Sequence, residues 1–190
     1  TVVERDGRKF YVVDGRERPL MTKTITVRVK TAGGFEEQQF PAYYTHRGPI
    51  VRVANGKWVS TQLMNSPLIA LQQSYLRTKT HDLESYKKVM ALHTNSSNNT
   101  LFADAGGNIA YFHSNFVPRR DTTFNWRQPV DGSTSRADWK GLHTFDESPN
   151  LVNPPNGWVY NTNNYPYSPA GPYSPRKSAY PAYMDAGSEN

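Results

Sequence analysis

The residues best suited to chemistry lie in one short stretch near the C-terminus, VYNTNNYPY, residues 159–167. Asn161, Asn163 and Asn164 stand there in a run rich in proline and tyrosine, a composition typical of coil. An asparagine in such a loop can simply shape a turn, because its short side chain bonds the nearby backbone and tolerates left-handed conformations. Its amide N–H can also point at a reacting oxygen and stabilise negative charge there. The stretch alone leaves both roles open.

The other polar residues give weaker indications of a functional site. No two histidines show the i, i+4 spacing of a zinc-binding helix, so we expect hydrogen-bonded or solvated side chains at His46, His81, His93, His113 and His143. The sequence contains no cysteine, which excludes disulfides, thiolate metal sites and a cysteine nucleophile within this chain. Arg119 and Arg120 could bind an anion, but such a pair after a strand more commonly belongs to a charged turn.

Residues 1–64 have the pattern of a small antiparallel β module. In TITVRVK, residues 24–30, apolar and polar residues alternate with the period of a half-buried strand. Asp14-Gly15 predicts a turn after an apolar run, and Asn55-Gly56 predicts a tight hairpin turn, because both residues of such a hairpin turn take positive φ.

Residues 65–97 predict a short helical insertion of two helices. In the first, Ser66 is a potential N-cap, Pro67 occupies the first helical position, and an apolar face is formed by Leu68, Leu71 and Tyr75. In the second, Asp82 is the potential N-cap, and an apolar stripe is formed by Leu83, Tyr86, Val89 and Met90. Each helix therefore has a recognisable start and one apolar side.

Residues 98–190 predict two strands followed by a long ordered coil. The strands flank a turn over residues 104–108, which Asp104 shapes and which contains Gly106-Gly107. Ten of the 14 prolines lie from Pro118 onward, which leaves little room for regular structure. We expect order nonetheless, since Trp126, Trp139 and Trp158 supply aromatic surface that can be buried.

Composition bounds the functional class. The 190 residues fit one domain or two small ones, and the formal net charge of +6 favours weak contact with polyanions. No basic run is dense enough for a nucleic-acid stripe, and no apolar run approaches the ~18 residues of a membrane helix. A freestanding basic β module that uses its twelve tyrosines to bind a polyanion or glycan is one hypothesis from these data.

Four stretches in colinear order carry a more specific resemblance. They are YYTHRGPIV (residues 43–51), NTLFADAGGNIAYFHSNFVPRRD (99–121), QPVDGSTSRADWKGLHTFDESPNLVNPPNGWVYNTNN (128–164) and YPAYMD (180–185). Together they resemble the middle of the β chain of the penicillin acylase family, which includes penicillin, cephalosporin and acyl-homoserine-lactone acylases. Residues 1–42 are similar to that family only through a strand, a turn and a further strand.

The resemblance implies an α+β fold in which residues 98–190 belong to an N-terminal-nucleophile (αββα) hydrolase core. In such an enzyme, a precursor cuts itself and the freed first residue of the β chain attacks an amide carbonyl. Its own α-amino group serves as the base. The parent protein would then cleave a small-molecule N-acyl amide, and its remaining α- and β-chain segments would be the partners of this one.

The family's oxyanion asparagine corresponds by motif to Asn163, the first of the NN pair. The family's nucleophile, its backbone oxyanion donor and its arginine belong to segments outside residues 1–190, and TVVERDGRKF does not resemble the family's start. We therefore do not expect Thr1 to be the nucleophile, and we expect the isolated chain to hydrolyse nothing. A degenerate relative that kept the scaffold without the chemistry is a third hypothesis.

The resemblance also bears on metals and on localisation. Asp185 is similar to a position that supplies a calcium-binding carboxylate in some family members, and the main-chain carbonyl near Trp126 is a possible companion. Several members need no metal, so a plain loop carboxylate is the commoner role for Asp185. No cofactor is required, and a bound calcium would be structural. Family members are commonly exported, which implies a periplasmic or secreted protein with neither nucleic acid nor membrane as partner.

Overall fold

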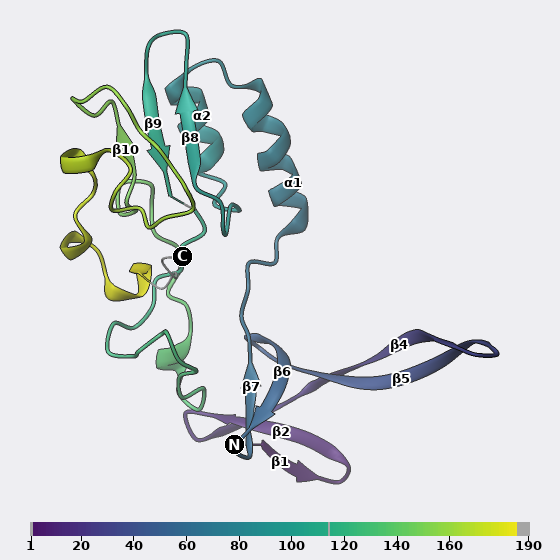
Figure 1. Ribbon diagram of the computed structural model, residues 1–190. Helices are drawn as coiled ribbons and strands as arrows, with labels where there is room; N and C mark the ends of the chain where they lie inside the picture. The colour runs from purple at the N-terminus through teal and green to yellow at the C-terminus, as the bar shows by residue number, and fades with distance from the viewer. Residues whose placement is uncertain (1, 114, 186–190) are drawn as a thin grey trace. The chain divides into compact units, whose positions relative to one another are not determined.

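The computed structural model describes residues 2–113 and 115–185, and of residue 185 only the backbone (Figure 1). It is mixed α+β, with antiparallel sheets and few helices. Two compact units are formed, one by Thr1–Leu63 with Pro129–Asp138 and the other by Met64–Gln128 with Trp139–Asn190. The expected insertion thus groups with the segments that follow it, and a ten-residue stretch of the coil groups with the β module. No described helix is both long and apolar enough to span a bilayer.

The first unit contains two antiparallel sheets. One has the order β1-β2-β3, with strands Val2–Arg5, Arg8–Val13 and Arg16–Pro19. The other has the order β4-β5-β6-β7, with strands Met21–Thr31, Gly34–Thr45, Gly48–Ala54 and Lys57–Ser60. The core of this unit consists of buried Tyr11, Val13 and Leu20, against which Val2, Tyr43, Ile50 and Trp58 pack. The aromatic rings of Tyr43 and Trp58 lie 5.2 Å apart.

The two turns predicted in this unit are confirmed. Asp14 and Gly15 have φ of 49° and 75° and join β2 to β3, while Asn55 and Gly56 have φ of 50° and 70° and join β6 to β7. Two consecutive positive φ values match the right-handed twist of the flanking strands. The residue types therefore determine the turn of both hairpins, although the β6–β7 register shifts between Ile50 and Arg52.

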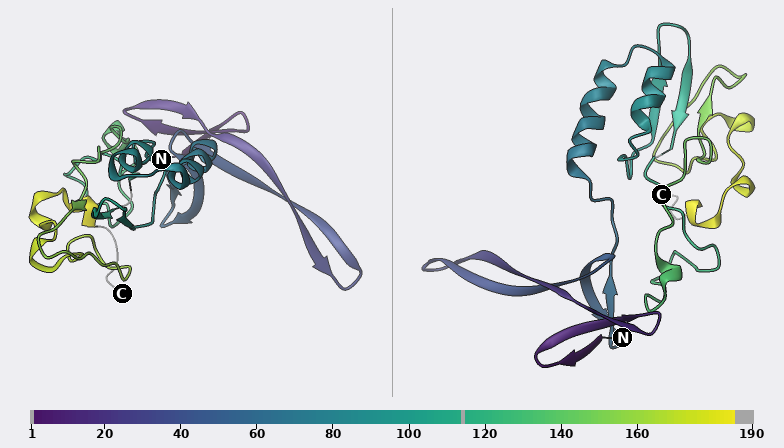
Figure 2. Two further views of the ribbon diagram at one scale, coloured as in Figure 1. Left: turned by 90° about the horizontal axis from the view of Figure 1, so that it is seen from above. Right: turned by 180° about the vertical axis from the view of Figure 1, so that it is seen from behind.

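The β4–β5 hairpin differs from the sequence expectation. Residues 24–30 do form a strand, but Ile25 and Val27 on its apolar face are 46% and 43% exposed. The hairpin extends as a long twisted ribbon beyond the other strands of its unit (Figure 2), so no other strand of that unit covers this face. An alternating pattern shows which residues share a face of a strand, but not whether a neighbour covers that face.

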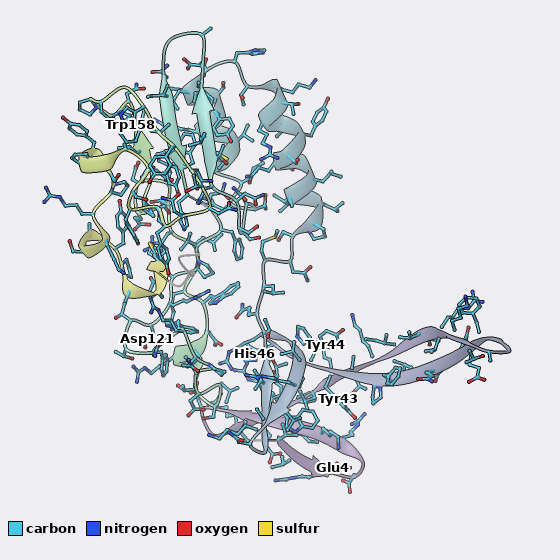
Figure 3. The ribbon with its side chains drawn as sticks, viewed as in Figure 1. Glu4, Tyr43, Tyr44, His46, Asp121 and Trp158 are labelled. Carbon is cyan, nitrogen blue, oxygen red and sulfur yellow. The ribbon has the colours of Figure 1, made fainter. Side chains whose placement is uncertain are left out.

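Arg47 holds residues 129–138 to this unit. Its Nε donates to Asp138 Oδ1 at 2.7 Å, and its two terminal nitrogens donate to the carbonyls of Gly132 (2.7 Å) and Thr134 (2.9 Å). His46, labelled in Figure 3, adds a 3.0 Å contact from Nε2 to the same Asp138 oxygen. Burial acts to raise the pKa of Asp138, but the hydrogen bonds from His46 and Arg47 outweigh it and lower that pKa below its ordinary value. The arginine of HRGP is thus a structural clamp.

Arg47→Met is expected to lower the free energy of unfolding by about 2–3 kcal/mol, because a charged donor is removed from one carboxylate and two carbonyls. Chemical denaturation of the protein measures this change. Arg52→Met is the matched control, since Arg52 lies exposed on the adjacent strand, and it should cost less than about 0.5 kcal/mol. Equal costs at the two positions would show that the clamp contributes no stability.

The second unit begins with the two predicted helices, α1 (Pro67–Leu76) and α2 (Leu83–Met90), joined by a 3₁₀ turn at Arg77–Lys79. Asp82 caps α2 as expected, since its carboxylate accepts from Ser85 N at 2.7 Å and a capping box closes the turn. Ser66 occupies the N-cap position of α1, but its side chain makes no capping hydrogen bond there. Pro67 stands at the first helical position, as predicted.

The predicted apolar face of α1 is exposed. Leu68, Leu71 and Tyr75 are 81%, 69% and 62% exposed, whereas Gln73 on the other side is buried. Gln73 Oε1 accepts hydrogen bonds from the backbone N and the hydroxyl of Thr94 at 3.0 and 2.7 Å. A polar contact thus sets the side of α1 that faces the rest of its unit, a choice that apolar spacing does not reveal.

The sheet of the second unit has the order β10-β9-β8, with β8 at Thr100–Ala103, β9 at Ile109–Phe112 and β10 at Leu151–Val152. The predicted turn joins β8 to β9. There Asp104 accepts hydrogen bonds from Asn108 N at 2.9 Å, Asn108 Nδ2 at 2.8 Å and Leu83 N at 3.1 Å. One carboxylate therefore holds the turn and ties it to the start of α2.

The core of this unit lies between α2 and the sheet. It is formed by buried Leu83, Tyr86, Met90, Ala110 and Phe112, with Phe102, Phe145 and Val152 packed around them. Most of the apolar stripe predicted for α2 contributes, which confirms the side of that helix that is buried. The ends of β8 and β9 at Thr100 and Phe112 are thereby fixed against a helix.

After Phe116 the chain runs mostly as coil through residue 185. It contains short 3₁₀ turns at Ser135–Ala137, Gly171–Tyr173, Lys177–Ala179 and Ala182–Asp185. Trp139 packs edge-on against Phe116 at 5.6 Å, and Trp158, labelled in Figure 3, lies 6.0 Å from Tyr160 and is 46% exposed. Aromatic contacts and turns thus replace regular structure in the proline-rich third.

Candidate functional site

Asn163 lies exposed in the loop that contains the three asparagines. Its φ of 62° is in the left-handed region, which asparagine tolerates better than most residues with a Cβ. Within residues 2–113 and 115–185, no hydrogen bond holds its side chain. The amide of Asn163 is therefore available to a group that approaches from outside the loop.

The neighbouring asparagines instead build the loop. Asn164 Oδ1 accepts from the backbone N of Thr162 at 3.0 Å, and Asn164 Nδ2 donates to the hydroxyl of Ser168. A main-chain hydrogen bond of 2.8 Å from Tyr160 to Pro169 closes the loop at its base. Asn164 thus has the turn-shaping role that is ordinary for asparagine in coil, and its amide N–H is already engaged.

A further asparagine, Asn99, connects this loop to the sheet. Its Nδ2 donates to Asn161 Oδ1 at 3.2 Å and to the carbonyl oxygen of Asn164 at 3.4 Å. Its Oδ1 lies 2.9 Å from His113 Nδ1. Asn99 directly precedes β8 and His113 directly follows β9, so the paired strands bring both side chains to one end of the hairpin.

Burial lowers the pKa of His113 to about 4, so its imidazole is neutral at pH 7. The unfolded chain binds the proton near pH 6.5, and more protons are therefore bound in the unfolded state between pH 6.5 and pH 4. The contribution of His113 to the free energy of unfolding has its full value above about pH 6.5. It decreases as the pH falls toward 4, by about 1.4 kcal/mol per pH unit.

His113→Asn is expected to weaken the acid sensitivity of the fold in this window, because Asn carries a donor near the position of Nδ1 and does not titrate. Denaturant unfolding measured from pH 7 to pH 4 should show a shallower loss of stability in the variant. Burial also lowers the pKa of His143, so the comparison of the two proteins isolates His113. Parallel stability curves would contradict a neutral buried His113.

The second unit also contains a cavity of about 280 Å³ at the same end of the sheet. Phe112, His113, Phe145 and Ser148 are among the residues that line it, and Asn163 is not. A more open hollow of about 690 Å³ is lined by residues of the coil between Tyr167 and Ser178, again without Asn163. Neither space by itself places a substrate against the candidate amide.

The two proposed calcium ligands are not brought together by anything described. Trp126 Nε1 donates to the carbonyl of Asp121 at 2.7 Å, and Arg120 stacks on the indole ring at 5.2 Å. The side chain of Asp185 lies outside the described part of the chain. Within that part, no group of three or more His, Asp or Glu side chains could hold a metal ion. Calcium prefers about six to eight oxygen ligands, and the described residues bring no such set of carboxylates together. The calcium site therefore stays a prediction.

The chain belongs to the penicillin amidase family, since the family model with the description "Penicillin amidase" matches residues 1–185. Among curated proteins, 68 residues are 43% identical to penicillin G acylase of Escherichia coli, and this match covers 36% of the chain and 8% of that protein. Among solved structures, a thermostable penicillin G acylase from Alcaligenes faecalis has a TM-score of 0.72 at 23% identity. That likeness covers 86% of this chain and 30% of the solved one, and it supports the mixed α+β fold.

The NTNN loop was singled out from the sequence, but the bonds from Asn99 to the loop and from His113 to Asn99 were not expected. A signal was present, because the residue before one strand of a tight hairpin lies opposite the residue after the other strand. Thr100 pairs with Phe112, and the two polar residues just beyond this pair therefore meet. The partner of Asn99 in the coil, at a separation of 62 residues, carried no local signal.

Proposed function

We propose that this chain is part of an acylase that hydrolyses N-acyl amides and that Asn163 stabilises the oxyanion of the reaction. Membership of the penicillin amidase family supports the hydrolase class of the parent protein. The single observation that supports the residue is its environment: Asn163 is exposed in an anchored loop, while the asparagine beside it is engaged in hydrogen bonds.

The proposed reaction needs a donor of this kind twice. A nucleophile from a segment outside this chain attacks the amide carbon, and the carbonyl oxygen becomes an oxyanion to which Asn163 Nδ2–H donates. Collapse of this intermediate expels the amine and leaves an acyl-enzyme, which water hydrolyses through a second oxyanion. A preorganised donor lowers both barriers, because it binds the charge as the charge develops.

A neutral carboxamide suits this position. It offers an N–H without a formal charge, so it does not bind the carboxylate product as tightly as an arginine or a lysine does. The left-handed backbone of Asn163 also limits the residue types that fit there without strain. Chemistry and local conformation thus favour the same residue.

The test is turnover by the full-length parent protein on a set of N-acyl p-nitroanilides that differ in the acyl group. The proposal predicts release of the amine and formation of an acyl-enzyme, visible as a burst in rapid-mix kinetics. The isolated 190-residue chain should release none, since it is expected to lack the nucleophile. A parent protein without turnover on any member of the set would leave the degenerate-relative hypothesis in its place.

No observation favours the alternative of a tyrosine-rich module that binds a polyanion or glycan. Tyr11, Tyr86 and Tyr111 are only 8%, 6% and 1% exposed, so part of the expected stacking surface is core. The family match covers nearly the whole chain and points to a hydrolase. Export to the periplasm or the outside of the cell and a structural calcium remain proposals that follow from the family resemblance.

A further inference from the structure

We propose that Asn99 is a positioning residue for the oxyanion loop and sets the place of Asn163 without touching the substrate. This inference rests on the proposed function of Asn163. Asn99 bridges the start of β8 and the coil, and it reaches the loop on both sides of Asn163. Its contacts are to the side chain two residues before Asn163 and to the main chain one residue after it.

The orientation of the Asn99 amide follows from its partners. The carbonyl oxygen of Asn164 can only accept a hydrogen bond, so the Asn99 atom that faces it must be Nδ2. The remaining atom, Oδ1, then faces His113 Nδ1 at 2.9 Å, and this nitrogen must carry the proton. A flipped Asn99 amide would place an acceptor against the Asn164 carbonyl. His113, the Asn99 amide and the Asn164 carbonyl therefore form one directed chain of hydrogen bonds from the sheet to the loop.

The sheet end of this chain is rigid. Asn99 and His113 flank the paired residues Thr100 and Phe112, and Phe112 is 1% exposed in the core beneath α2. The backbone N of His113 also donates to Asn150 Oδ1 at 2.9 Å. A donor fixed in this way transmits the position of the sheet to a loop that has no regular structure of its own.

Such precision matters because Asn163 has no side-chain anchor among the described residues. Its place depends on the backbone of the loop, and a displacement of about 1 Å at a catalytic group can cost ~100-fold in rate. The two bonds from Asn99 restrict that backbone next to the residue that must not move. Loss of Asn99 is thus expected to affect the chemical step more than substrate binding.

Asn99→Asp is the sharpest variant for the test. It keeps the size of the side chain and an oxygen toward His113, but it replaces the donor to Asn161 and Asn164 by an acceptor. In the full-length protein, we expect kcat to fall by roughly 10- to 100-fold with KM within about threefold. Asn99→Ala should behave similarly. Asn156→Ala is the matched control, since Asn156 bridges to Ala170 in the same coil, and it should leave kcat within about twofold.

A double-mutant cycle separates positioning from general damage. In the Asn163→Ala background, Asn99→Asp should change kcat by less than about twofold, because Asn99 acts through Asn163. Equal losses in both backgrounds, or full kcat in Asn99→Asp, would overturn the inference alone. Full kcat in Asn163→Ala would overturn the proposed function together with it. If the Asn99 variants do not fold, Asn161→Ala removes one acceptor from the loop side, and an unchanged kcat there would also refute the inference.

Discussion

Replacement of Asn163 by alanine in the full-length protein is expected to lower kcat by about 10²- to 10³-fold, with little change in KM. In the proposed mechanism the amide donates only to the oxyanion, so its removal should raise the barrier without weakening the ground-state complex. An interaction made mainly in the transition state lowers kcat and kcat/KM by similar factors. Steady-state kinetics on a cleavable N-acyl amide measures both quantities.

Two variants define the specificity of this effect. Asn163→Asp keeps the shape but places a negative acceptor beside the oxyanion, so the loss should be at least as large as with alanine. Asn164→Ala removes bonds to Thr162 and Ser168 and should lower stability as well as activity. Thermal unfolding distinguishes the two positions, because Asn163→Ala removes no hydrogen bond of the loop and should lower the melting temperature less than Asn164→Ala, only by the strain of alanine at a left-handed φ. A kcat within threefold of wild type in Asn163→Ala would contradict its role.

The largest effect on stability is expected at Phe112. Its side chain is 1% exposed, and its ring lies 5.5 Å from that of Tyr86 and 5.3 Å from that of Phe145. Phe112→Ala removes this surface and leaves a cavity between α2 and the sheet, which should cost about 3–5 kcal/mol of unfolding free energy. Denaturant titration followed by tryptophan fluorescence measures the change.

Phe112→Leu is the graded control for this prediction. It preserves most of the volume and should cost less than alanine, because a smaller cavity remains and the neighbouring rings can move toward it. Both variants also disturb the end of β9 next to His113, so loss of activity should accompany loss of stability. A cost below about 1 kcal/mol for Phe112→Ala would show that this aromatic cluster is not the core of its unit.

Local features of the fold could be predicted from the sequence where neighbouring residues decide them. The turns at Asp14-Gly15 and Asn55-Gly56 and the cap at Asp82 depend on conformational preference or on a bond within a few residues. The covering of apolar faces could not be predicted in this way. The β4–β5 hairpin and α1 have regular apolar spacing, yet their apolar side chains are exposed. Apolar spacing does not show whether another element packs against that face.

In the candidate site, too, a local motif could be read from the sequence and the long-range contacts could not. Asn163 was proposed through a motif, and the structure places it exposed and at a left-handed φ. The support beneath the loop was not found, since the bonds from Asn99 span 62 and 65 residues. The join of residues 129–138 to the β module through Arg47 is equally distant in sequence. Contacts of this range follow from the folded topology and not from local pattern.

The most direct test of the proposed role of Asn163 is the affinity of a tetrahedral phosphonate analogue of the acyl-transfer intermediate. Wild-type and Asn163→Ala full-length proteins are compared, with the matching unreactive amide as the ground-state reference. We predict that the variant loses about 10²- to 10³-fold in affinity for the phosphonate, in parallel with kcat/KM, while the amide binds equally well to both. Equal affinity of both proteins for the phosphonate would contradict an oxyanion contact at Asn163.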